Sequence, residues 1–165
     1  MHVKFPHYGR TTCLILIATM VMFALAAPMA TAAAESASFN SPVGSWKTVD
    51  DKTGQVKAIV EIREVNGVLE GRITDLFHPP APHPLCLKCS GALKNKPVLG
   101  MRILWGMRRQ GDAWTGGHIL DPETGSIYRC TISLEDEGKV LRVRGYIGLS
   151  VFGRTEQWVR VKDKR

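Results

Sequence analysis

Gly44-Ser45-Trp46 begins the first strand-like segment of this sequence, and Arg154-Thr155-Glu156-Gln157-Trp158-Val159-Arg160 ends the last one. A Gly-x-Trp on the first strand and an arginine on the last are the pattern by which an up-and-down β-barrel closes one end. The indole of Trp46 plugs such a barrel, and a guanidinium packs across its face in a cation–π contact worth about 0.5–2 kcal/mol. We predict four barrel-closing residues, and among the arginines we prefer Arg160 over Arg154 because it lies nearest the end of the strand: Trp46, Arg154, Trp158 and Arg160. A closed barrel has an internal cavity or a filled core, so the pattern favours a binding protein over an enzyme.

Between these stretches the chain alternates apolar and polar residues, as half-buried strands do. The clearest example runs from Val56 to Arg63. Turn-forming residues separate the strand-like segments, at 52–54, 66–67, 110–112, 121–125 and 136–138. This spacing predicts an all-β fold, a roughly eight-stranded antiparallel up-and-down barrel.

The N-terminus has the features of a secretory signal peptide. Basic Lys4 and Arg10 precede an apolar run at 13–27, which is shorter than the roughly 20 residues that a membrane span needs. The small residues Ala32-Ala33-Ala34 follow. We predict a signal peptide at 1–34 cleaved near Ala34, a flexible leader at 35–42 and a single barrel domain at 43–165. The mature protein is then expected in the periplasm or secreted.

A proline- and cysteine-rich loop at 78–98 interrupts the strand pattern, and it contains Cys86-x-x-Cys89. In an oxidising compartment we expect a disulfide between Cys86 and Cys89 and no cofactor. The alternative is a zinc site, for which four ligands are at hand: His78, His83, Cys86 and Cys89. Pairing with Cys130, or redox work, is a further alternative, although Cys130 lies in a strand where a buried thiol is expected.

Aromatic residues and one arginine are the candidates for ligand binding: Trp105, Trp114, Tyr128, Arg144 and Tyr146. Trp105 and Trp114 flank one predicted hairpin, across which they could face each other as an aromatic wall. Ordinary core packing is the competing interpretation. Arg144 has apolar neighbours, so it either forms a structural pair or binds the carboxylate or phosphate head group of a ligand.

Charge and motifs limit the function further. The formal net charge is +7, of which +5 remains after removal of residues 1–34, because Lys4 and Arg10 are the charged residues of that segment. The simplest interpretation is that this charge maintains solubility, and the alternative is peripheral contact with anionic envelope components, while export makes nucleic acid a poor partner. No Gly-x-Ser-x-Gly, zinc-protease or phosphate-loop motif accompanies His118 or Ser150. Nothing in the chain therefore argues for catalysis.

The chain resembles domain-of-unknown-function family 2147, a group of uncharacterised exported bacterial proteins. The resemblance covers nearly all of the mature chain, and its matching stretches include Gly44-Ser45-Trp46 and Trp114-x-Gly116-Gly117-x-Ile119-Leu120-Asp121-Pro122. The densest are Arg144-Gly145-Tyr146-Ile147-Gly148 and Phe152-Gly153-Arg154-Thr155-x-x-Trp158-x-Arg160. It implies a lipocalin-like fold and an envelope location, and it brings no catalytic residue. We expect a barrel that binds a small apolar or amphipathic ligand. A filled barrel with an interaction or structural role is the alternative, and an enzyme is a distant third.

Overall fold

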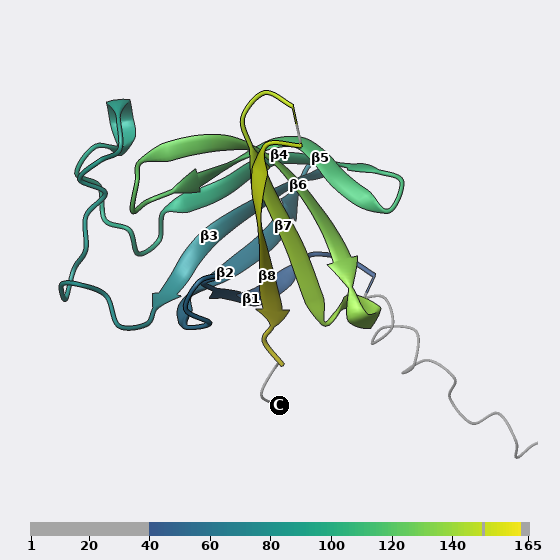
Figure 1. The fold of residues 1–165 in the computed structure, drawn as a ribbon, viewed down its shortest axis with the longest axis horizontal. Coiled ribbons are helices and arrows are strands. Elements are labelled where there is room, and N and C mark those ends of the chain that lie inside the picture. The colour runs from purple at the N-terminus through teal and green to yellow at the C-terminus, as the bar shows by residue number, and fades with distance from the viewer. Residues whose placement is uncertain (1–39, 150, 163–165) are drawn as a thin grey trace, which may run out of the picture. The chain divides into compact units, whose positions relative to one another are not determined.

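A computed structural model describes residues 40–149 and 151–162, so the predicted signal peptide and most of the predicted leader lie outside the described residues. Eight strands follow one another in this part of the chain: β1 (Gly44–Val49), β2 (Val56–Val65), β3 (Val68–Leu76), β4 (Arg102–Gln110), β5 (Ala113–Asp121), β6 (Ser126–Glu135), β7 (Val140–Tyr146) and β8 (Gly153–Arg160). Each strand pairs antiparallel with the next, and β8 pairs with β1 to close the barrel (Figure 1). The predicted all-β up-and-down barrel is confirmed.

Helical structure in the described part of the chain is restricted to two single turns, η1 (Gly91–Leu93) and η2 (Asp136–Gly138). No helix there is long and apolar enough to cross a membrane.

The barrel interior is built from alternate residues of all eight strands, because successive side chains of a strand point to opposite faces. The two tryptophans on the first and last strands, Trp46 and Trp158, are 0% and 1% exposed. Aliphatic and sulfur-containing side chains bury the remaining inward face: Val60, Ile62, Leu69, Leu104, Met107, Cys130, Ile132, Leu141 and Val143. The core therefore follows the apolar alternation of the sequence.

The up-and-down path gives the barrel two different ends. One end, here called the Trp46 end, contains the start of β1, the end of β8 and the turns at 66–67, 111–112 and 136–138. The other, here called the opposite end, contains the turns at 50–55 and 122–125, the described residues 147–149 and 151–152 between β7 and β8, and the long loop at 77–101.

The proline- and cysteine-rich loop packs outside the barrel against β4 and β5. Ile103 and Leu120 alternate with the inward-facing Leu104 and Ile119, so they point outward, yet they are only 5% and 2% exposed. The Cys86–Cys89 disulfide is present, both cysteines are buried, and they belong to the same apolar cluster as Ile103 and Leu120. The loop thus covers an apolar strip on the outer wall.

The disulfide segment and the β5–β6 turn lie in close contact. Cys86 Sγ is 3.3 Å from the carbonyl oxygen of Pro122. A Cβ atom added to Gly125 would lie 2.1 Å from the carbonyl oxygen of Lys88 and 2.7 Å from the amide nitrogen of Cys89. Since Gly125 also has a φ of +72°, no other residue fits there without moving one of the two segments.

Candidate functional site

Trp46 and Arg160 together seal the Trp46 end. The guanidinium carbon of Arg160 lies 4.2 Å from the centroid of the indole ring, and the indole Nε1 donates a hydrogen bond to the Pro42 carbonyl at 2.7 Å. Arg160 donates three further hydrogen bonds, to the carbonyl oxygens of Gly138 (2.7 Å), Val43 (3.0 Å) and Ser41 (2.7 Å). Partial burial lowers the pKa of Arg160. These contacts tie β8 to the segment before β1 and to the β6–β7 turn.

Arg154 lies at the opposite end of β8 and has acidic partners. It pairs with Asp51, and its guanidinium is 3.6 Å from Glu156 and 3.7 Å from Asp50. The hydrogen bond with Asp51 raises the pKa of Arg154. Trp158, further along β8, donates its indole N–H to the Glu156 carboxylate at 3.1 Å. Of the two candidate arginines, Arg160 is therefore the one over Trp46.

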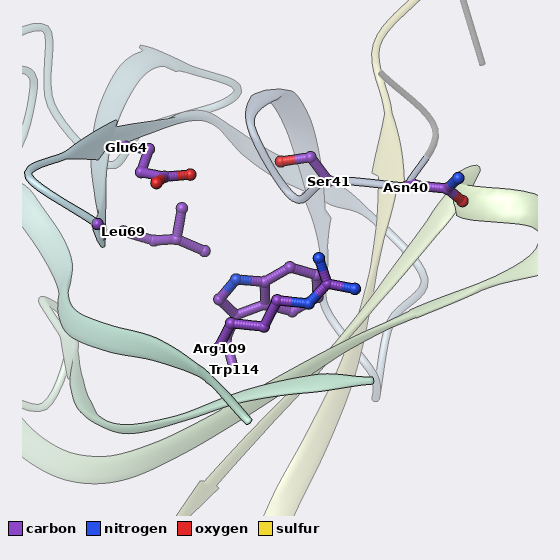
Figure 2. Close-up of a pocket in the computed structure, with 7 residues that line it drawn as sticks. Asn40, Ser41, Glu64, Leu69, Arg109 and Trp114 are labelled. Carbon is purple, nitrogen blue, oxygen red and sulfur yellow. The ribbon is translucent and has the colours of Figure 1, made fainter. Parts of the chain in front are cut away.

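A pocket of about 440 Å³ lies at the Trp46 end, beside the seal (Figure 2). It is lined by Asn40, Ser41, Glu64, Gly67, Leu69, Arg109 and Trp114. Leu69 and Trp114 are 1% and 6% exposed and form its apolar floor. Arg109 and Glu64 are exposed and contribute one charge of each sign to its rim.

Arg109 covers the indole of Trp114 in this pocket. The two residues are direct partners across the β4–β5 hairpin, and the guanidinium carbon lies 5.5 Å from the ring centroid. The Nε atom of Arg109 also donates to the Gly111 carbonyl at 3.2 Å. Figure 2 shows the Arg109 side chain over the indole of Trp114, with Leu69 beside the pair. A ligand in the pocket would meet the exposed Arg109 cation first, with the largely buried Trp114 ring beneath it.

The structure brings only Trp114 of the five ligand-binding candidates into this pocket. Trp105 pairs with His118 rather than with Trp114, and the two rings stack at 5.8 Å between centroids on the outer face of β4 and β5. The expectation that Trp105 and Trp114 face each other is wrong, because the β4–β5 register places Trp105 opposite His118 and Trp114 opposite Arg109. Irregularities in the neighbouring strand pairs, near Gly71 and between Trp114 and Gly117, accompany a change of face between the two tryptophans.

The other three candidates lie toward the opposite end. Tyr128 is half-buried and shares the inward face of β6 with Cys130. Arg144 is on the outer face, where it donates to Thr155 Oγ1 at 2.8 Å and to the Val151 carbonyl at 3.2 Å. Tyr146 is half-buried at the end of β7. These positions do not form one site with Trp114.

Six lining residues of the pocket were not anticipated as site residues from the sequence: Asn40, Ser41, Glu64, Gly67, Leu69 and Arg109. Arg109 carries a recognisable signal, since it precedes the Gln110-Gly111-Asp112 turn and the hairpin register places it opposite Trp114. A second hollow, of about 420 Å³, lies at the opposite end and is lined by Gln55, Val56, Phe77 and His78.

The residues of the alternative zinc site are not arranged as a ligand set. Cys86 and Cys89 are bonded to each other, so neither is present as the thiolate that binds zinc. His78 and His83 are both exposed. Within residues 40–149 and 151–162 no group of three or more His, Cys, Asp or Glu side chains is placed to hold a metal ion.

Cys130 is a free, buried thiol on the inward face of β6. Burial, with a smaller effect of the Glu156 carboxylate, raises the pKa of Cys130 to about 12. The thiol is therefore neutral at physiological pH.

Comparisons with known proteins support the fold. The family model described as "Uncharacterized protein conserved in bacteria (DUF2147)" matches residues 44–160. Among solved structures, the chain is similar to protein HP1028 from the human pathogen Helicobacter pylori, which is described as belonging to the lipocalin family. The TM-score is 0.65 at 18% sequence identity, over 74% of this chain and 84% of that chain. A comparison with curated proteins finds no match. At this identity the likeness shows a lipocalin-like fold alone.

Proposed function

We propose a function from the site itself, because the chain belongs to the family of uncharacterized bacterial proteins whose model matches residues 44–160. The protein binds a small amphipathic molecule in the pocket at the Trp46 end. The lipocalin-like fold is consistent with binding of a small hydrophobic ligand. The observation that carries the proposal is the pairing of an apolar floor, Leu69 and Trp114, with a cation, Arg109, across the ring.

The chemistry of this pocket suits a molecule with an apolar tail and an anionic or hydroxylated head. Indole and leucine side chains supply apolar contact area, and an arginine supplies donors that match a carboxylate or a phosphate. The Glu64 carboxylate on the rim repels an anionic head because both are negatively charged, so such a head should lie toward Arg109 and away from Glu64. The pocket volume is within the range of small-molecule sites.

Binding of dodecanoate, followed by isothermal titration calorimetry, tests the proposal. Arg109→Gln should weaken binding about 5–30-fold, which corresponds to about 1–2 kcal/mol for one charge-assisted hydrogen bond at a partly exposed rim. Arg108→Gln is the matched control, because Arg108 pairs with Thr115 on the other face of the same strand. Glu64→Gln should leave binding unchanged or strengthen it, since it removes a negative charge from the rim.

The floor of the pocket is tested with a second pair of variants. Trp114→Phe should weaken binding of dodecanoate and of dodecyltrimethylammonium alike, because it shortens the aromatic surface that both tails contact. Trp105→Phe, on the outer face of the barrel, should leave both affinities unchanged. The proposal fails if neither amphiphile binds, or if the Arg109 and Arg108 variants behave identically.

We also propose that the protein acts in the periplasm or outside the cell after removal of residues 1–34. The buried Cys86–Cys89 disulfide supports an oxidising compartment. Cell fractionation with N-terminal sequencing tests this, and a mature chain that begins near Glu35 in the exported fraction is the expected result.

A second candidate function is that of a filled barrel with an interaction role in the envelope. It is favoured by the large, fully buried side chains in the barrel interior, among them Trp46, Trp158 and Met107. Native mass spectrometry of freshly purified protein separates the two candidates. A co-purified small molecule supports the binding function, whereas a bare mass together with no amphiphile binding supports the filled barrel.

A further inference from the structure

The turn between β7 and β8 carries four apolar side chains that point into solvent. Ile147, Leu149, Val151 and Phe152 are 70%, 71%, 77% and 74% exposed. We call these four residues the apolar tip. Single exposed apolar residues are ordinary, but turns are usually built from polar residues, Gly and Pro, and a cluster of this kind marks an interaction site. In Figure 1 this turn projects beyond the strands that carry it.

The backbone of the apolar tip is partly satisfied from within the protein. The Phe152 amide donates to the Leu149 carbonyl at 3.1 Å. The Val151 carbonyl accepts a hydrogen bond of 3.2 Å from Arg144, which also donates to Thr155 on β8. Unsatisfied backbone groups are what keep most loops out of an apolar phase. These hydrogen bonds lower that cost for the tip.

The residues next to the tip are of the kinds found where a membrane meets water. Tyr146 directly precedes the tip, and Arg129 is its partner across the β6–β7 pair on the outer face. Arg144 lies two residues before Tyr146 on the same face. Aromatic rings with a polar end favour the head-group level of a bilayer, and arginines there attract anionic lipids. The order from tip to barrel is therefore apolar, then aromatic and cationic.

We propose that the apolar tip inserts into the surface of an anionic phospholipid bilayer, with Tyr146 and Arg129 at the head-group level. Four side chains of these types, about three quarters exposed, offer roughly 200–350 Å² of apolar area. A stable protein interface needs roughly 800 Å² on each partner and a complementary surface. A bilayer needs neither, since lipid chains adapt to a small convex projection. The proposal rests on this turn alone and does not depend on the pocket, which is at the Trp46 end.

Vesicle co-sedimentation of the processed, purified protein tests the proposal, with vesicles of phosphatidylethanolamine and phosphatidylglycerol. The tip variant replaces Leu149 and Phe152 with serine, and its vesicle affinity should fall about tenfold or more, because each side chain loses its transfer to an apolar phase. The control variant replaces Val65 and Val159, which are 51% and 44% exposed elsewhere on the barrel, with serine as well. Its affinity for the vesicles should be within about twofold of that of the parent. All variants share one N-terminus, so residues before the barrel contribute equally.

A second readout reports insertion directly and does not need a weakened variant. An environment-sensitive fluorophore on Leu149→Cys should shift to shorter wavelength when vesicles are added, and the same label on Val65→Cys should not. Arg129→Gln should reduce binding to the anionic vesicles at low salt and lose that effect at high salt.

Three results would overturn the proposal. The first is a parent protein that does not bind these vesicles, and the second is a tip variant that binds them as the parent does. The third is evidence that the apolar tip binds a second copy of the protein instead of a bilayer. Light scattering would then show a concentration-dependent dimer, and the Leu149/Phe152 variant would abolish the dimer without changing vesicle binding.

Discussion

Replacing Arg160 with alanine should destabilise the barrel far more than replacing Arg154, although both arginines are on β8. Arg160 donates three hydrogen bonds to backbone carbonyls and covers the Trp46 ring. Each charge-assisted bond is worth about 1.5–3 kcal/mol when buried, and the cation–π contact about 0.5–2 kcal/mol. Partial exposure screens these contributions. The substitution also removes the side-chain entropy that an arginine loses on folding, which offsets part of the lost stability. We expect a loss of about 2–4 kcal/mol.

Arg154→Ala is the matched control for this experiment. Arg154 is exposed and its partners Asp51 and Glu156 have side chains about one third exposed, and ion pairs open to solvent are worth about 0–1 kcal/mol. Urea unfolding measures the change in the free energy of unfolding and thermal unfolding the change in melting temperature, both followed by tryptophan fluorescence. At about 4 °C per kcal/mol for a domain of this size, Arg160→Ala should melt about 8–16 °C below the parent and Arg154→Ala within about 4 °C. Equal losses in the two variants, or a larger loss for Arg154→Ala, would refute the assignment of the seal to Arg160.

Three further predictions concern the cysteines and one glycine. Cys130, whose pKa is raised to about 12 from 9.0, should resist a thiol reagent at pH 8 in the folded protein and react only at the rate of unfolding. The thiol ionises at lower pH in the unfolded chain than in the folded protein, so the free energy of unfolding should fall as the pH rises from about 9 to about 12. Rapid labelling of the native protein would contradict this burial. Gly125→Ala should displace the disulfide segment and lower the melting temperature. Gly54→Ala is the control, because Gly54 has a similar φ but no atom within 4 Å of the added Cβ, so only the backbone strain remains. Equal shifts of the two variants in differential scanning fluorimetry would argue against close packing at Gly125. Replacing both Cys86 and Cys89 with alanine should shift the melting temperature by only a few degrees, since the bridge closes a very short loop, while limited proteolysis of 78–98 should accelerate; a loss of cooperative unfolding would show that the loop is needed for the fold.

The sequence predicts the barrel well because its fold depends on local patterns. Alternation from Val56 to Arg63 and the turn residues between segments mark the strands, and an up-and-down barrel only joins neighbours along the chain. The buried, outward-facing Ile103 and Leu120 could not be recognised in this way. Alternation shows which residues share a face, but it cannot show that a distant loop covers the outer face as well.

The candidate site was harder to predict, because register irregularities decide which side chains meet. The irregularity between Trp114 and Gly117 changes the face of the residues that follow it, so hairpin position alone misplaces Trp105 relative to Trp114. The Arg109–Trp114 pair depends on the β4–β5 register, which has no such shift. Glu64 and Leu69 join the pocket only through the neighbouring β2–β3 turn, and nothing in their local sequence distinguishes them from ordinary strand residues.

The pairing of β1 with β8 has a consequence for how the barrel forms. Its register contains only Trp46↔Arg160 and Lys47↔Val159, whereas the hairpin pairings join strands adjacent in the chain. Closing a loop between residues more than a hundred positions apart carries the largest entropy loss of any pairing in this topology, so we expect this seam to form after the seven pairings between consecutive strands. The Trp46–Arg160 contact is then made after the folding transition state, and it slows the opening of the barrel without hastening its assembly. How long the closed barrel persists is set at the meeting point of its first and last strands.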